Sequence, residues 1–131
     1  MLRRFQHFSA LAAMAILAAA PAHATEFLKA IDDVPLVKGL AELPDPIVFE
    51  SDQGRVVRTA AQGIVPGAQI VSFYMASLPE LGWKPVAADT GLAFERENER
   101  LTIGVRESGA GEPVQVRFEL IVKLASTRLS E

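Results

Sequence analysis

Apolar and polar residues alternate most regularly near the C-terminal end of the chain, between Val114 and Leu124. Every second position of this segment is apolar, and the positions between are polar except Ile121. A period of two places the apolar set on one face of a β-strand. The segment therefore predicts a long strand with one buried face, whose register is strongly fixed because a slip of one residue would expose the whole apolar set.

A period of three to four replaces this alternation between Pro66 and Trp83. It predicts one helix, with a stripe that must be buried, formed by Ile70, Phe73, Tyr74, Ser77, Leu78 and Leu81. Pro66 is expected at the start of this helix, because proline suits the first helical turn. Pro79 predicts the end of the helix near Ser77 or Leu78, because proline disfavours helical geometry at the residue before it. Gly82 is a suitable left-handed exit residue.

Two shorter segments before the helix, Ile47–Glu50 and Arg55–Gln62, predict a hairpin closed by the turn Ser51-Asp52-Gln53-Gly54. The predicted register places Phe49 opposite Val57 and Ile47 opposite Thr59 on one face. The other face then carries Val48, Val56 and Ala60, which is more apolar than a fully solvated face should be.

Three more strands are predicted after the helix, over Trp83–Ala88, Leu92–Glu97 and Arg100–Glu107. A tight turn at Asn98-Glu99 would pair Glu97 with Arg100. The same register places Phe94 opposite Ile103 and Leu92 opposite Val105.

Together these elements predict an α+β two-layer sandwich in the order ββαββββ, with one helix packed on an antiparallel sheet of about six strands. The single domain is expected over residues 47–124. Residues 25–46 are broken repeatedly by proline, glycine and aspartate and predict an extended N-terminal arm, anchored by Val34, Leu36, Leu40 and Leu43. The arm either packs on its own domain or docks on a partner. Residues 125–131 are expected to fray.

The first 24 residues have the pattern of a signal peptide. Arg3 and Arg4 precede an uncharged apolar run, and a small-residue end predicts cleavage after Ala24. The run is short for a membrane span, so a periplasmic protein with no span after cleavage is expected, with a retained anchor as the alternative. Cleavage would remove both arginines and make the mature chain more acidic than the whole chain, whose net charge is −3. Nucleic acid is therefore not an expected partner.

The mature chain would also contain no histidine or cysteine, since the chain has no cysteine and both histidines, His7 and His23, lie in this segment. This excludes histidine- and cysteine-based catalysis and metal sites. Glu95, Glu97 and Glu99 are expected on one outward, solvated face of a hairpin, where nothing would tune a catalytic pair of carboxylates. No enzyme activity and no cofactor are expected.

Three strings, GRVVRTAAQG, FYMASLPELGW and LAFERENERLTI, cover much of the region from Gly54 to Ile103. They resemble small exported proteobacterial proteins that share a GR-[IV]-V, FY-x-x-x-LP-x-LGW and F-x-R-E-x-E-x-L-x-I pattern and are uncharacterised, so the resemblance implies no site. More loosely, a helix carrying Phe-Tyr and ending in Gly-Trp before an antiparallel sheet is similar to the helix-grip domains of outer-membrane assembly lipoproteins. These are binding modules without catalytic activity, but this chain has no cysteine for lipidation.

The first functional hypothesis is a non-enzymatic interaction module of the cell envelope. If their strands are neighbours, Val48, Val56 and Ile121 form a candidate surface for a partner protein or for weak self-association. Incidental surface apolar residues, or contacts with the arm, are the alternative explanation. The second hypothesis is a carrier of a small apolar ligand held between helix and sheet, in a groove formed by Phe73, Tyr74 and Trp83. Core packing is the simpler role of these three aromatic side chains.

Overall fold

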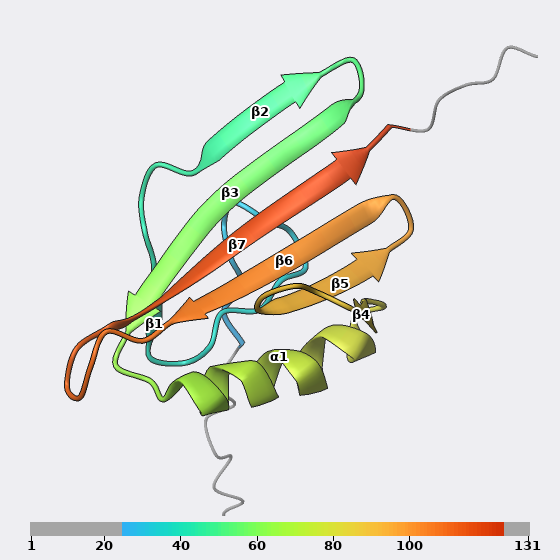
Figure 1. Ribbon diagram of the computed structural model, residues 1–131. Coiled ribbons are helices and arrows are strands. Elements are labelled where there is room, and N and C mark those ends of the chain that lie inside the picture. The colour runs from blue at the N-terminus through green and yellow to red at the C-terminus, as the bar shows by residue number, and fades with distance from the viewer. Residues whose placement is uncertain (1–24, 125–131) are drawn as a thin grey trace, which may run out of the picture.

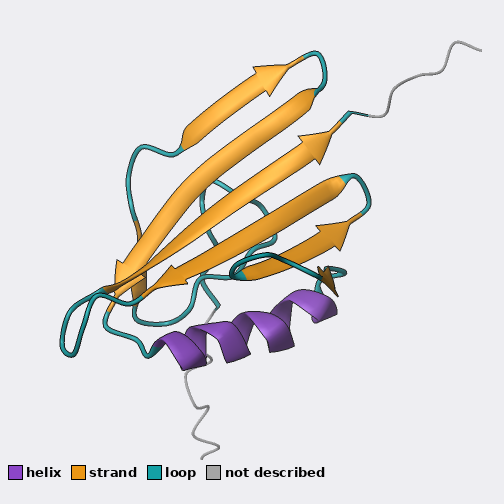
Figure 2. Cartoon of the chain, viewed as in Figure 1, coloured by secondary structure: helices purple, strands orange, loops and turns teal. Residues whose placement is uncertain are grey.

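The computed structural model describes residues 25–124, which form one helix and an antiparallel sheet of seven strands (Figures 1 and 2). The predicted α+β class is confirmed. The elements follow in the order β1 (Leu40–Glu42), β2 (Ile47–Ser51), β3 (Gly54–Gly63), α1 (Gly67–Glu80), β4 (Lys84–Val86), β5 (Leu92–Arg96), β6 (Glu99–Arg106) and β7 (Val114–Lys123). The predicted signal peptide and C-terminal tail lie outside the described residues.

The sheet has the order β1-β3-β7-β6-β5-β4, with β2 also paired to β3. One edge of β3 is occupied by β7 along its full length, so β1 and β2 share the other edge, one after the other. The chain crosses from this edge to β4 at the opposite edge through α1, as Figure 1 shows. The two longest strands, β3 and β7, thus lie side by side in the interior of the sheet.

The helix covers the face that the alternation of β7 predicts to be buried. In β7 the side chains of Val114, Val116, Phe118 and Leu120 are buried, and Leu120 lies in register between Val57 of β3 and Leu101 of β6. We call this side of the sheet the core face and the other side the outer face. The core face is apolar because residues of one parity on adjacent strands all point to it.

Helix α1 buries Ile70, Tyr74 and Leu78 against the core face. It runs two residues beyond the predicted end, so that Pro79 lies inside its last turn. A proline there removes a single intrahelical hydrogen bond, and the backbone N–H groups of Leu81 and Trp83 both donate to the Leu78 carbonyl (3.0 and 3.1 Å). Gly82 then leaves the helix with a φ of +89°, as predicted.

The arm does not stand apart from the domain but covers the core face next to the helix. Its apolar side chains are buried at Leu28, Ile31, Val34, Leu36, Val37 and Leu40, and Leu43 is half-buried. The hydroxyl of Tyr74 donates to the Pro35 carbonyl (2.8 Å), which joins arm to helix inside the core. The arm also contributes β1, a strand too short for its three residues to be recognised by alternation.

The predicted register of β2 on β3 is wrong by one residue. Asp52 and Gln53 alone form the loop, Ser51 pairs with Gly54, and Phe49 therefore pairs with Val56. The Ser51 hydroxyl accepts a hydrogen bond from the Gln53 N–H (3.2 Å), which stabilises the shorter loop. As a result, Phe49 and Ile47 lie on the outer face, and Val48 lies on the side of the core face.

The register of β5 on β6 differs from the prediction by two residues, which leaves the faces unchanged. The turn falls at Glu97-Asn98, with Glu97 at a φ of +54°. The Asn98 side-chain amide donates to the Lys123 carbonyl (2.6 Å) and the Asn98 carbonyl accepts from the Lys123 N–H (2.9 Å), so the turn is held on the end of β7. Arg100 consequently pairs with Glu95 (2.8 Å) and not with Glu97.

Candidate functional site

The three aromatic residues of the predicted ligand groove belong to the core. Tyr74 and Trp83 are fully buried and Phe73 is half-buried. The ring of Tyr74 makes edge-to-face contacts with Phe73 and Phe118, at centroid distances of 5.1 and 5.7 Å. Burial raises the pKa of the Tyr74 hydroxyl well above its ordinary value, and the backbone of Val37 acts more weakly in the opposite direction.

Neither Tyr74 nor Trp83 lines any of four surface hollows found in residues 25–124. Phe73 borders one of them, on the side of the arm. The space between helix and sheet beside Tyr74 is therefore filled by packed side chains.

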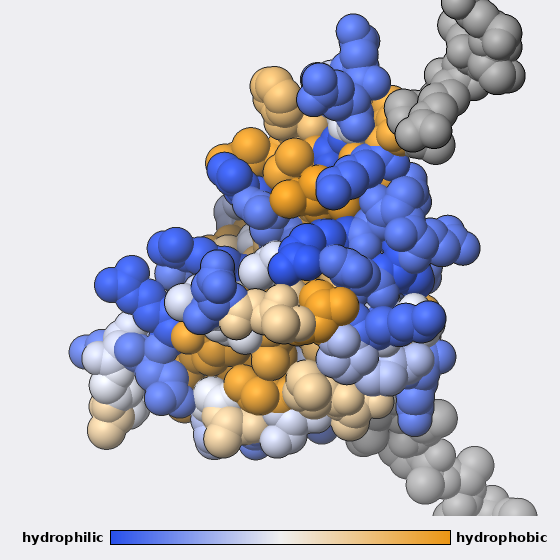
Figure 3. Space-filling view, turned by 45° about the vertical axis from the view of Figure 1, so that its right-hand side comes forward, coloured by the Kyte–Doolittle hydropathy of each residue, from blue (hydrophilic) through white to orange (hydrophobic). Residues whose placement is uncertain are grey.

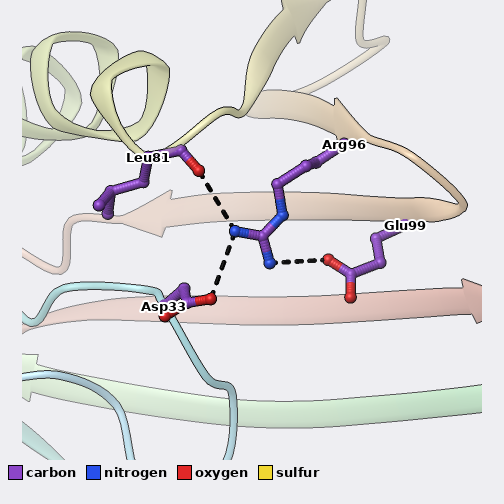
Figure 4. A network of polar contacts seen from close by, with 4 residues as sticks. All are labelled: Asp33, Leu81, Arg96 and Glu99. Atoms are coloured by element: carbon purple, nitrogen blue, oxygen red, sulfur yellow. Dashed lines mark hydrogen bonds and ion pairs between the residues drawn. The ribbon is translucent and has the colours of Figure 1, made fainter.

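Arg96 closes the core at the C-terminal end of the helix (Figure 4). Its guanidinium lies 4.4 Å from the centre of the Trp83 ring, where a cation–π contact is favourable. The same group contacts Glu99 (3.0 Å), Asp33 (3.4 Å) and the Leu81 carbonyl (3.3 Å). Arg96 thus joins the arm, the helix end and the hairpin of β5 and β6. Sequence reasoning missed this role, since the partners come from separate segments.

The predicted partner surface is only partly assembled. Val56 and Ile121 are direct neighbours across β3 and β7 on the outer face and are both half-buried. Val48 pairs with Val57 and so lies on the other side of the sheet. Its place beside Val56 is taken by Phe49. We call the row Phe49, Val56 and Ile121 the outer patch.

The outer patch ends at a sheet edge that the described residues leave uncovered. All five residues of β2 are exposed, and the strand pairs only with β3. Ile47, Val48 and Phe49 are 64%, 49% and 65% exposed. In Figure 3, apolar surface lies among charged side chains at the height where Figure 1 draws β2 and the adjoining ends of β3 and β7.

A hollow of about 560 Å³ opens on the outer face next to this edge. Its floor follows β3, β7 and β6 at Ala60, Arg117 and Gly104, which pair in one row. Its wall is the connection between β1 and β2, residues 43–46, together with Ile47. The only sequence signal for this hollow is the presence of two small residues, Ala60 and Gly104, in otherwise regular strands.

The three carboxylates considered for catalysis do not share a face. Glu95 lies on the outer face beside Arg100, Glu97 lies in the turn, and Glu99 is half-buried beside Arg96. Within residues 25–124 no group of three or more acidic side chains is placed to hold a metal ion. No helix of this part of the chain is long and apolar enough to cross a membrane.

Comparison of the chain with protein-family models, with curated proteins and with solved structures found no match.

Proposed function

We propose that this protein is a non-enzymatic interaction module of the cell envelope, and that its partner adds a β-strand to the free edge of β2. The observation that carries the proposal is the exposure of three consecutive apolar residues, Ile47, Val48 and Phe49, on a strand paired along one edge only. Native edge strands are usually protected by charge, proline or a bulge. Within β2 the one charged residue is Glu50.

The hairpin geometry indicates which backbone groups a partner would meet. A two-residue loop is flanked by a pair that exchanges both of its backbone hydrogen bonds, and such pairs alternate along the ladder. Ser51, Phe49 and Ile47 therefore direct their backbone groups toward β3. Val48 and Glu50 direct their N–H and C=O groups to the free edge, where an added strand can pair with them.

The outer patch supplies specificity for the added strand. Phe49 stands at the edge, and Val56 and Ile121 continue the apolar row into the sheet. An incoming strand with an apolar side chain opposite Phe49 would extend this row, because side chains on paired strands share a face. Its other apolar side chains would lie beside Val48, on the opposite side of the sheet.

Two features of the sequence support the remaining parts of the proposal. The first 24 residues have the pattern of a secretory signal, which favours a partner in the envelope. Beyond that segment the chain carries neither histidine nor cysteine, which favours binding over catalysis. A second copy pairing β2 with β2 would bury only a short strand edge, so self-association of this kind would be weak.

A pull-down of the tagged mature protein from native periplasm tests the proposal. Phe49→Lys places a charge at the centre of the edge, and Val71→Lys is the matched control on the exposed side of α1. We expect the same specific protein with the wild type and with Val71→Lys, and its loss with Phe49→Lys. Equal recovery with all three proteins would overturn the assignment to β2.

A carrier of a small apolar ligand is the second candidate, and the hollow on the outer face favours it. The groove first expected beside Tyr74 and Trp83 would require the packed core to open. Native mass spectrometry of protein purified from the periplasm distinguishes the two functions, because a carrier should retain a bound ligand in the absence of any protein partner.

A further inference from the structure

The hollow on the outer face results from small residues in the sheet and from a wall segment that is hydrogen-bonded to it. Ala60 and Gly104 flank Arg117 on either side, so only one long side chain rises from this row. A Cβ atom added at Gly104 would meet no atom within 4 Å. The Leu43 N–H donates to the Ala60 carbonyl (2.7 Å), which fixes the wall segment 43–46 against the floor.

The charges around the hollow are divided between a paired and an unpaired set. Arg58 and Glu119 form an ion pair of 2.6 Å at one side. Arg117 and Asp45 also line the hollow, and neither has an ion-pair partner within 4 Å among the described residues. One free cation and one free anion thus border a surface whose other lining residues are mostly small or apolar, among them Leu43, Pro44, Pro46 and Ile47.

We infer that this hollow binds a small zwitterion with an apolar body, of the class of a short apolar peptide. Its carboxylate would pair with Arg117 and its ammonium group with Asp45, while its side chains cover Pro44, Pro46 and Ile47. A ligand with a single charge would use only one of these two exposed groups. The volume of about 560 Å³ lies within the range of small-molecule sites.

Binding of leucyl-leucine to the mature protein, followed by NMR titration of the Ala60 and Gly104 amides, tests the inference. We expect saturable binding, weakened about fivefold when the peptide is N-acetylated or C-amidated, which is the scale of one exposed ion pair. Absence of saturable binding up to about 10 mM peptide would overturn the inference.

Three variants assign the two ends of the ligand. Arg117→Gln should weaken binding of the free peptide but not of its amide. Asp45→Asn, which tolerates the φ of +63° at this position, should weaken binding of the free peptide but not of its N-acetyl form. Gly104→Val should abolish binding of all forms by filling the floor.

Arg55→Gln, which removes an exposed arginine outside the hollow, is the matched control and should leave the affinity unchanged. Urea unfolding of each variant verifies that it is folded. Equal affinity of the wild type, Arg117→Gln and Asp45→Asn for all peptide forms would contradict the zwitterion assignment. None of these variants alters the outer patch, so the peptide site and the proposed partner edge can fail separately.

Discussion

Replacing Tyr74 with phenylalanine removes a single hydroxyl from the centre of the fold. This hydroxyl is buried and donates to the Pro35 carbonyl at 2.8 Å, so it links the helix to the arm. A neutral hydrogen bond contributes about 0.5–1.5 kcal/mol, and a buried acceptor left without a partner costs about 1–3 kcal/mol. We expect Tyr74→Phe to lower the free energy of unfolding by about 1–3 kcal/mol, which for a domain of this size lowers the Tm by about 4–8 °C per kcal/mol.

The same substitution changes the dependence of stability on pH. Burial raises the pKa of Tyr74 in the folded state above the unfolded value of about 10. Folding therefore favours the protonated form of Tyr74. The stability that this form contributes is fully present below about pH 10 and is lost as the pH rises beyond it. In Tyr74→Phe this alkaline loss of stability is absent.

Urea unfolding followed by fluorescence gives both quantities, since Trp83 is the only tryptophan of the chain. Tyr74 is the only tyrosine, so alkaline absorbance of the phenolate reports its ionisation directly. Ser72→Ala, at an exposed position of the same helix, is the matched control and should change stability by less than about 0.5 kcal/mol. A loss below about 0.5 kcal/mol for Tyr74→Phe, or phenolate formation near pH 10 in the folded protein, would show that the Tyr74 hydroxyl does not stabilise the core.

Three further stability predictions use the same unfolding assay. Arg96→Lys should cost about 1–2 kcal/mol, because lysine keeps the charge but not the planar fork that contacts three oxygens and covers the indole; a neutral result would mean that only the charge matters there. Glu107→Gln should lower the free energy of unfolding by about 0.5–1 kcal/mol, since the Glu107 carboxylate accepts a hydrogen bond from the Gly67 N–H (2.9 Å) at the start of α1. The loss should shrink in high salt, and an equal loss in low and high salt would contradict a role for the charge. Gly54→Ala should destabilise strongly, because a Cβ would collide with the backbone of β7; Gly104→Ala is its control and should be nearly neutral.

The elements that the sequence predicted correctly are those whose pattern is long. The alternation of β7 and the helical stripe of α1 extend over many residues, so both the element type and the buried face follow from them. Strand β1 has three residues, and its pairing with β3 depends on the arm being held against the sheet by the core. No local pattern encodes that condition.

The candidate surface was predicted in part for a related reason. Val56 and Ile121 lie in long strands whose faces follow from alternation, and the pairing of β3 with β7, which the sequence does not predict, makes them neighbours. Phe49 was assigned to the wrong face because its register depends on a loop of two residues. A shift by one residue exchanges the faces of a strand, so a small difference in the turn replaced Val48 with Phe49 in the outer patch.

Site-specific photocrosslinking in cells that produce the protein tests directly whether a partner strand pairs with the free edge of β2. A photoreactive residue replaces Phe49 at the free edge in one protein and Met75, 44% exposed on α1, in another. We expect one discrete protein adduct from position 49 and none from position 75. The adduct should be lost when Val48 is also changed to proline, which removes a backbone donor at the edge. An adduct from position 75 alone would place the interface on the helix and rule out strand addition at β2.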